Sequence, residues 1–264
     1  MTAAALATNA RVARSLSMRA LRQALRRPQF IAPLVIFPSL MLAANTGGAG
    51  RATDLPGFPH VHSFLDFELA GAMLQSSMLA GVSGGIALAL DFEMGFIDRL
   101  FAAPISRYTI IAGRIAATLA MGIGVSIWFL AGGLLFGAQI EGGVLGVVVI
   151  AGLVCLAAGA FATLASALAI GAGKASVVQG IFPLVFVILF LSTAFFPEKL
   201  LLQPARGIAQ LNPLSLIADG IRGAIIGPVQ IGDVGKALGG IAMVGVVGLV
   251  LSTWALRRRE RRGS

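Results

Sequence analysis

The 264-residue chain is too apolar for a soluble globular protein, with 57% hydrophobic and 12% charged residues, because soluble domains average about a quarter charged residues. The net charge of +9 does not indicate a nucleic-acid-binding protein either, since the basic residues flank apolar runs instead of covering one soluble face. The composition therefore excludes soluble enzymes and nucleic-acid-binding modules, and it predicts an all-α integral membrane protein in contact with the lipid bilayer.

Six apolar runs are candidates for crossing a bilayer as helices. A crossing takes about 20 mostly apolar residues, because the backbone polar groups must form hydrogen bonds within the segment. The first run contains Pro33 and Pro38, and the glycine-rich residues 45–50 after it are typical of a loop, so its full crossing stays open. We expect one transmembrane domain over residues 1–264, with spans at residues 30–45, 66–90, 108–136, 143–170, 175–195 and 234–256.

The distribution of basic residues predicts the direction of these spans. Lys and Arg close to span ends favour the cytoplasmic side. They are more frequent at both ends of the chain and after the second and fourth spans than in the other connections, so we expect six spans with both termini, including the basic tail 257–264, in the cytoplasm. Arg51, Lys199, Arg206, Arg222 and Lys236 would then lie on the outer side.

Residues 1–27 form a basic segment before the first span. On a helical wheel five of its six arginines fall within an arc of roughly 140°. We expect an amphipathic helix that lies on the anionic surface of the cytoplasmic leaflet and ends before Pro28. A disordered basic tail is the alternative. The five residues are Arg11, Arg14, Arg19, Arg22 and Arg26.

The connection between the second and third spans, residues 91–106, predicts a short amphipathic helix on the cytoplasmic side. Pro104 would end this helix, and Ser106 would cap the next one. Glu93 falls on the apolar face of the wheel, so either it has a buried cationic partner or the helix begins after it. The apolar face holds Phe92, Phe96, Ile97, Leu100 and Phe101, and the polar face holds Asp91, Gly95, Asp98 and Arg99.

This connection resembles the coupling helix of type-2 ABC exporter permeases, especially those of the daunorubicin-resistance group. It reads acidic-x-Glu-x-Gly-x-apolar-acidic-Arg-Leu and then Pro-x-Ser-Arg, although many relatives carry a basic residue or a glutamate in place of Asp91. The resemblance extends to the basic N-terminal segment, to Phe196-Pro197 and to residues 212–223. The resemblance implies that nine residues of this connection couple the permease to an ATPase. They are Asp91, Glu93, Gly95, Asp98, Arg99, Leu100, Pro104, Ser106 and Arg107.

The resemblance implies an exporter in the bacterial inner membrane. ATP and Mg²⁺ would bind two copies of a separate ABC ATPase subunit, whose closure pushes on the membrane helices, and this chain would hold no cofactor. A second permease copy would complete the assembly as a homodimer or a homologous heterodimer. The implied cargo is an amphipathic drug or lipid, with an oligosaccharide or glycolipid as the alternative.

Residues 196–230 predict an external re-entrant region, too short and too charged to cross. Asn212 is suited to cap a helix that has Pro213 in its first turn. Asp219 and Arg222 are three residues apart and can form an ion pair, and direct contact with the cargo is the alternative role. A stripe of Ile217, Ile221 and Ile225 lies on another side of the same helix.

Other candidate sites in the sequence are incomplete. Gly173-Lys174 fails the phosphate-loop pattern, because Leu168 and Ala175 stand where glycine and serine or threonine are needed. His60 and His62 have no third ligand nearby, so we expect no metal site. No nucleophile and base are arranged for catalysis. An ion-gradient-driven secondary transporter is the alternative function, but it would favour charges within the spans, and the six apolar runs are free of charge. These runs cover residues 30–50, 69–90, 115–140, 142–173, 175–197 and 237–256.

Overall fold

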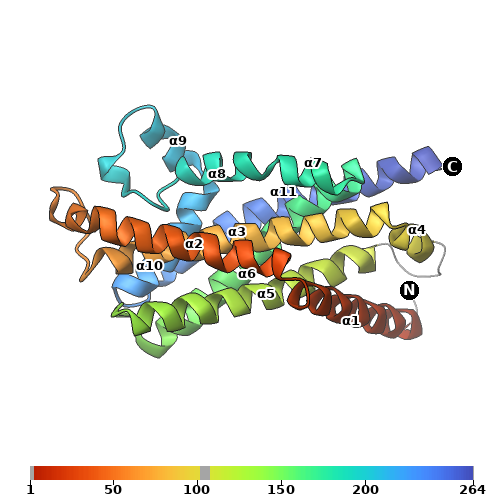
Figure 1. Ribbon diagram of the computed structural model, residues 1–264, viewed down its shortest axis with the longest axis horizontal. Helices are drawn as coiled ribbons and strands as arrows, with labels where there is room; N and C mark the ends of the chain where they lie inside the picture. Colours follow the sequence, from red (N-terminus) through yellow and green to blue (C-terminus); the bar gives the residue numbers. More distant parts are fainter. Residues whose placement is uncertain (1–2, 102–107, 264) are drawn as a thin grey trace.

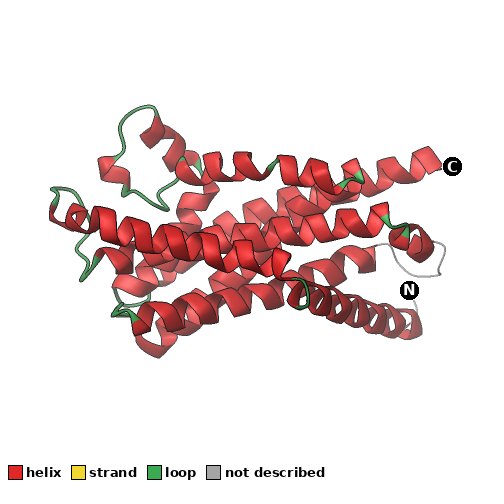
Figure 2. Cartoon of the chain, in the orientation of Figure 1, coloured by secondary structure: helices red, strands yellow, loops and turns green. Residues whose placement is uncertain are grey.

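The computed structural model describes residues 3–101 and 108–263, and all regular elements in this part of the chain are helices. Figure 1 shows the elements along the chain, and Figure 2 shows that most of the described chain is helical. The elements are α1 (Ala3–Leu25), α2 (Pro28–Ala49), η1 (Gly50–Asp54), α3 (Phe64–Glu93), α4 (Phe96–Phe101), α5 (Tyr108–Leu135), α6 (Gly143–Ala172), α7 (Ala175–Gly180), α8 (Phe182–Phe190), η2 (Glu198–Leu200), α9 (Ala205–Leu211), α10 (Pro213–Ile226) and α11 (Ile231–Gly263).

Within the described residues, five helical segments are long and apolar enough to cross a membrane: α2 with η1, α3, α5, α6 and α11. The run expected as one span at residues 175–195 is instead divided into α7 and α8, so that neither helix alone has the required length. Pro183 is the second residue of α8, a position that favours the start of a new helix because proline has no backbone N–H to donate. The sixth crossing therefore stays a prediction.

The first span is longer than the sequence pattern suggested. Helix α2 runs through Pro33 and Pro38 and continues to Ala49, so the expectation of a loop at residues 45–50 was wrong. A helix retains its internal hydrogen bonds where water cannot replace them, and this outweighs the weak helix propensity of glycine. The extra turn brings Asn45 of α2 beside α3, where its side chain donates a hydrogen bond of 2.6 Å to Oε1 of Glu68.

Helices α3 and α6 form the centre of the bundle. Nearly every residue of α3 is buried, and it packs against α2, α5, α6, α7 and α10, while α11 packs along α6. Two glycines allow α3 to approach α6 closely: a Cβ at Gly81 would lie 2.5 Å from the Phe161 Cβ, and one at Gly85 would lie 2.6 Å from the Ala165 Cβ. Small residues at such crossings are typical of membrane helices.

The two ends of the bundle are different (Figure 1). One end, which we call the proximal end, holds the start of α1, helix α4 and the end of α11. Element η1, helix α9 and the turn between α5 and α6 lie at the opposite, distal end. Helix α1 projects from the bundle and packs mainly against α5. Arg11, Arg14 and Arg22 of α1 are exposed, as is Arg26 just after its end, whereas Arg19 is half-buried.

Candidate functional site

The proximal end holds a buried ion cluster that joins three helices. Asp91, in the last turn of α3, is only 1% exposed. Its carboxylate accepts hydrogen bonds from Nη1 and Nη2 of Arg19 on α1, at 3.2 and 3.0 Å, and from Nη2 of Arg114 on α5, at 2.7 Å. The sequence pattern predicted Asp91 on the polar face of a docking helix and indicated no partner for Arg114. The structure instead buries both residues.

Arg114 explains why a carboxylate is needed at this position. Its side chain is 8% exposed, and a buried guanidinium stays protonated, so it must have an anion and hydrogen-bond acceptors nearby. Asp91 supplies the negative charge that Arg114 needs, and Arg19 donates two further hydrogen bonds to the Asp91 carboxylate. An arginine next to the apolar run 115–140, within the expected span 108–136, is a signal in the sequence that a buried acidic partner is required, but it does not identify that partner.

Gly95 separates the end of α3 from α4. Its φ is +66°, a left-handed conformation that costs other residues steric strain and that glycine adopts freely. The expectation of one continuous helix over residues 91–106 was therefore wrong: the segment consists of the end of α3, a glycine turn and the six-residue helix α4.

Helix α4 is anchored to the bundle by its first residues. The Ile97 side chain is buried in an apolar cluster with Phe92 of α3 and Ile110 of α5. The guanidinium of Arg19 lies 3.7 Å from the centre of the Phe96 ring, a favourable cation–π distance. Arg19 thus contacts α4 and Asp91 together, so a displacement of α4 would act on α1 and α3.

Glu93 has a different place from the one expected. It is exposed, and its Oε1 accepts a hydrogen bond of 2.8 Å from the backbone N–H of Ala175, the first residue of α7. A buried Glu93 within an apolar face was therefore wrong, whereas its alternative, an amphipathic helix that begins after Glu93, agrees with the start of α4. A carboxylate at a helix N-terminus satisfies a free N–H and the helix dipole. Glu93 thus joins α3 to α7.

The remaining residues of the coupling motif are only partly described. Arg99 is exposed, and Leu100 is half-buried against the proximal apolar cluster. Asp98 lies within α4, but its side chain is outside the described structure. Pro104, Ser106 and Arg107 lie outside the described residues.

A second polar cluster is centred on α10 at the distal end. Asn212 caps this helix by accepting a hydrogen bond from the Leu214 N–H at 3.0 Å, and Pro213 is its first residue. The Asn212 side chain also donates to the carbonyl oxygens of Ile188 and Leu191, at 2.8 and 3.0 Å. The cap therefore joins α10 to the end of α8.

Arg222 is the buried centre of this distal cluster. Its Nη1 donates to Oδ1 of Asp219 at 2.7 Å, and its Nη2 donates to the carbonyl oxygens of Thr193 and Ala194 at 2.9 and 2.8 Å. The guanidinium also lies 3.9 Å from the centre of the Phe67 ring. These contacts hold the 193–194 segment and α3 against α10, and they include the ion pair expected between Asp219 and Arg222.

Two buried polar residues of α3 lack a full set of hydrogen-bond partners among the described residues. Glu68 is fully buried and accepts a hydrogen bond from the Asn45 side chain, but its Oε2 has no partner among the described residues. The Gln75 amide, two turns further along α3, is also buried and unpartnered within that part of the chain. Unsatisfied buried polar groups are rare in stable cores, so the face of α3 that carries them is a candidate for polar contact during function.

Nothing in the described part of the chain groups three potential metal ligands from His, Cys, Asp and Glu. His62 lies beside the side chain of Gln139, with 3.1 Å between the two nitrogen atoms. Asp66 forms a capping box with Ser63 at the start of α3 and accepts a further hydrogen bond from the backbone of Gln139. These side chains organise the distal loops.

Comparison with known protein families gives one match. A family described as ABC-2 type transporter matches residues 11–226, which include most of α1, the proximal ion cluster, α4 and all of α10. No curated protein sequence matches the chain significantly.

Proposed function

The chain belongs to the ABC-2 type transporter family, and from this premise we propose that it is the permease subunit of an ATP-driven exporter. The cargo would be an amphipathic drug or a lipid-like molecule that leaves the cytoplasm or the inner leaflet. Support for the wider class comes from the multi-pass helical bundle and from the family match, which covers most of the chain. Support for the cargo class is the resemblance to the daunorubicin-resistance group.

We assign the proximal end to the cytoplasmic face of a bacterial inner membrane. The exposed arginines of α1, together with Lys174 and the basic end of α11, gather at this end, and basic residues favour the cytoplasmic side. Helices α7 and α8 lead from the proximal end of α6 towards α9 (Figure 1). They would complete a sixth crossing and leave both termini on the same side, and the region around α10 would be a re-entrant segment at the outer face.

The proximal ion cluster is the observation that carries the coupling proposal. Asp91 connects Arg19 and Arg114, and Arg19 covers the Phe96 ring of α4. We propose that α4 docks to an ABC ATPase subunit, one for each of two permease copies. ATP and Mg²⁺ would be held by these partners. A push on α4 would then reach α1, α3 and α5 through charged contacts that are costly to break in a buried setting.

The burial of Glu68 favours a second candidate function, that of an ion-gradient-driven secondary transporter. Buried, incompletely partnered carboxylates are typical of ion-coupled transporters, and one oxygen of Glu68 has no hydrogen-bond partner within the described structure. However, Glu68 lies in the second turn of α3, close to the distal end, so the ATP-driven mechanism is the better supported one. An ABC exporter of an oligosaccharide or glycolipid is the other alternative.

Transport in vesicles tests the proposal. The chain would be reconstituted together with a candidate ABC ATPase subunit, and accumulation of daunorubicin or of a fluorescent phospholipid would be followed. We expect accumulation to require ATP and an intact phosphate loop in the partner, and to persist when a protonophore abolishes the proton gradient. Transport by this chain alone, driven by an imposed proton gradient, would support the secondary transporter instead.

A further inference from the structure

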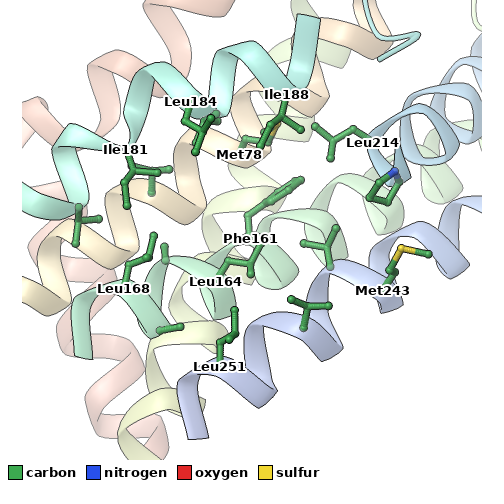
Figure 3. Close-up of a pocket in the computed structure, with 18 residues that line it drawn as sticks. Met78, Phe161, Leu164, Leu168, Ile181, Leu184, Ile188, Leu214, Met243 and Leu251 are labelled. Carbon is green, nitrogen blue, oxygen red and sulfur yellow. The ribbon is translucent and has the colours of Figure 1, made fainter. Parts of the chain in front are cut away.

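An apolar groove runs along one side of the bundle between α8 and α11 (Figure 3). It has a volume of about 490 Å³ and is lined almost entirely by carbon atoms, a size within the usual range for small-molecule sites. Leu184 of α8, Leu251 of α11 and Phe161 of α6 point into it from three directions (Figure 3).

The groove exists because α8 lies away from the rest of the bundle. Helix α7 packs against α3, and α11 packs along α6, but α8 makes only a few contacts with α3. Leu184 and Val247 remain more than one-third exposed although they line the groove. Since α6 and α11 are long enough to cross the membrane, this opening lies at the depth of the hydrocarbon chains, where lipid is the surrounding solvent.

Basic residues are located at the proximal end of the same groove. Lys174 is the N-cap residue of α7, four positions before the groove residue Val178. Arg258 follows Leu251 by seven positions on α11, which places both on one face of the helix. The end of α11 is held beside the α6–α7 turn, because Arg259 donates a hydrogen bond of 3.1 Å to the carbonyl oxygen of Ile170.

Trp254 marks the level at which the groove meets the polar region. Its side chain is 57% exposed, and the Arg258 guanidinium lies 5.2 Å from its ring centre. Exposed tryptophans are typical of the membrane–water interface. Nearby, Glu93 is used to cap α7 and Arg259 to cap α6, so the exposed Lys174 and Arg258 leave this end of the groove positively charged.

From these positions we infer that the groove binds an anionic phospholipid of the cytoplasmic leaflet. One acyl chain would lie between α8 and α11, and the headgroup phosphate would contact Lys174 and Arg258. Basic pockets between membrane helices on the cytoplasmic side recognise such headgroups. A second copy of the chain packed on the same groove by two-fold symmetry would bring two like-charged ends together. The inference rests on the proposed membrane orientation and does not require ATP-driven transport.

Tryptophan fluorescence can test this inference directly. The chain has two tryptophans, and Trp128→Phe leaves Trp254 as the single reporter beside the groove. The full chain would be placed in phosphatidylcholine vesicles that contain brominated phosphatidylglycerol or brominated phosphatidylcholine in equal amounts, since bromine atoms on the acyl chain quench a nearby indole. We expect the anionic lipid to quench Trp254 at lower mole fractions, with a preference of about fivefold for each basic side chain involved.

Paired variants separate the headgroup contact from the acyl-chain contact. Lys174→Gln with Arg258→Gln should abolish the preference for the anionic lipid, whereas Lys199→Gln with Lys236→Gln, which removes two charges at the distal end, should preserve it. Val247→Phe fills the groove and should lower quenching to the level of bulk lipid. Val246→Phe is the matched control, because Val246 is exposed on α11 but does not line the groove.

Each other outcome contradicts the inference in a distinct way. Equal quenching by the two lipids in the parent chain would mean that the headgroup is not recognised. Equal behaviour of Val247→Phe and Val246→Phe would mean that the acyl chain lies elsewhere. Absence of quenching by either lipid would show that protein covers the groove, as in a dimer. Because the assay contains no ATP and no cargo, its failure would leave the transport proposal standing, and a failed transport assay would leave the lipid site standing.

Discussion

The carboxylate of Asp91 lies 2.7 Å from the guanidinium of Arg114, and both side chains are buried where α3 ends and α5 begins. Arg19 approaches the same carboxylate from α1. Two cations therefore depend on one anion at the point where a force on α4 would enter the bundle. This relationship gives the first prediction.

Removal of the Asp91 charge should destabilise the protein. Asp91→Asn leaves Arg114 buried without a counter-charge, a change that typically costs about 3–5 kcal/mol. We expect a lower midpoint of thermal unfolding in detergent and a loss of export. Asp233→Asn is the matched control, because Asp233 pairs with Lys236 on the surface, where ion pairs contribute about 0–1 kcal/mol. Equal stability of the two variants would mean that the buried cluster is unimportant.

Glu93 should act through its hydrogen bond to α7. Glu93→Ala removes a charged contact at a helix N-terminus, which contributes about 0.3–1 kcal/mol. We expect normal abundance in the membrane and intact binding of the ATPase, but less cargo moved for each ATP hydrolysed. Glu93→Gln keeps an acceptor for the Ala175 N–H and should keep more of the transport. If the alanine variant loses the ATPase from the purified complex, Glu93 belongs to the docking surface instead.

Substitution of Gly95 should displace α4. Gly95→Ala places a Cβ on a residue with φ of +66°, and the left-handed conformation costs about 1–2 kcal/mol for residues other than glycine. We expect weaker co-purification with the ATPase. Gly171→Ala is a suitable control, because Gly171 is helical and nothing lies within 4 Å of an added Cβ. An ATPase bound equally well by both variants would contradict a docking role for α4.

Cysteine labelling in intact cells tests the orientation. In a Cys155→Ala background, Arg51→Cys at the distal end should react with an impermeant thiol reagent from outside. Lys174→Cys at the proximal end should react only after the cells are permeabilised, because basic residues are retained on the cytoplasmic side. The reverse pattern of labelling would place the termini outside and would contradict the assignment of the proximal end.

Most residues of the candidate site could be recognised in the sequence, but the contacts between them could not be predicted. The acidic and glycine residues of the coupling motif, the Asn212 cap and the spacing of Asp219 and Arg222 depend on local geometry, which a short stretch of sequence contains. The helical wheel of residues 91–106 failed because it assumed one continuous helix. The left-handed Gly95 separates α4 from α3, so the directions of Asp91 and Glu93 are set by α3 and not by the apolar face of α4, and Asp91 is buried while Glu93 is exposed.

The sequence by itself determined the membrane class, the family and most of the span positions, because bilayer thickness and backbone hydrogen bonding impose a length and a composition on each crossing. Only the tertiary structure decided which charges meet. Asp91 lies 72 residues from Arg19 and 23 from Arg114 in the chain, and no local pattern indicates which of two nearby carboxylates will face them. Which carboxylate pairs with the two arginines depends on the packing of α1, α3 and α5. A buried guanidinium pairs with the anion that the fold places beside it.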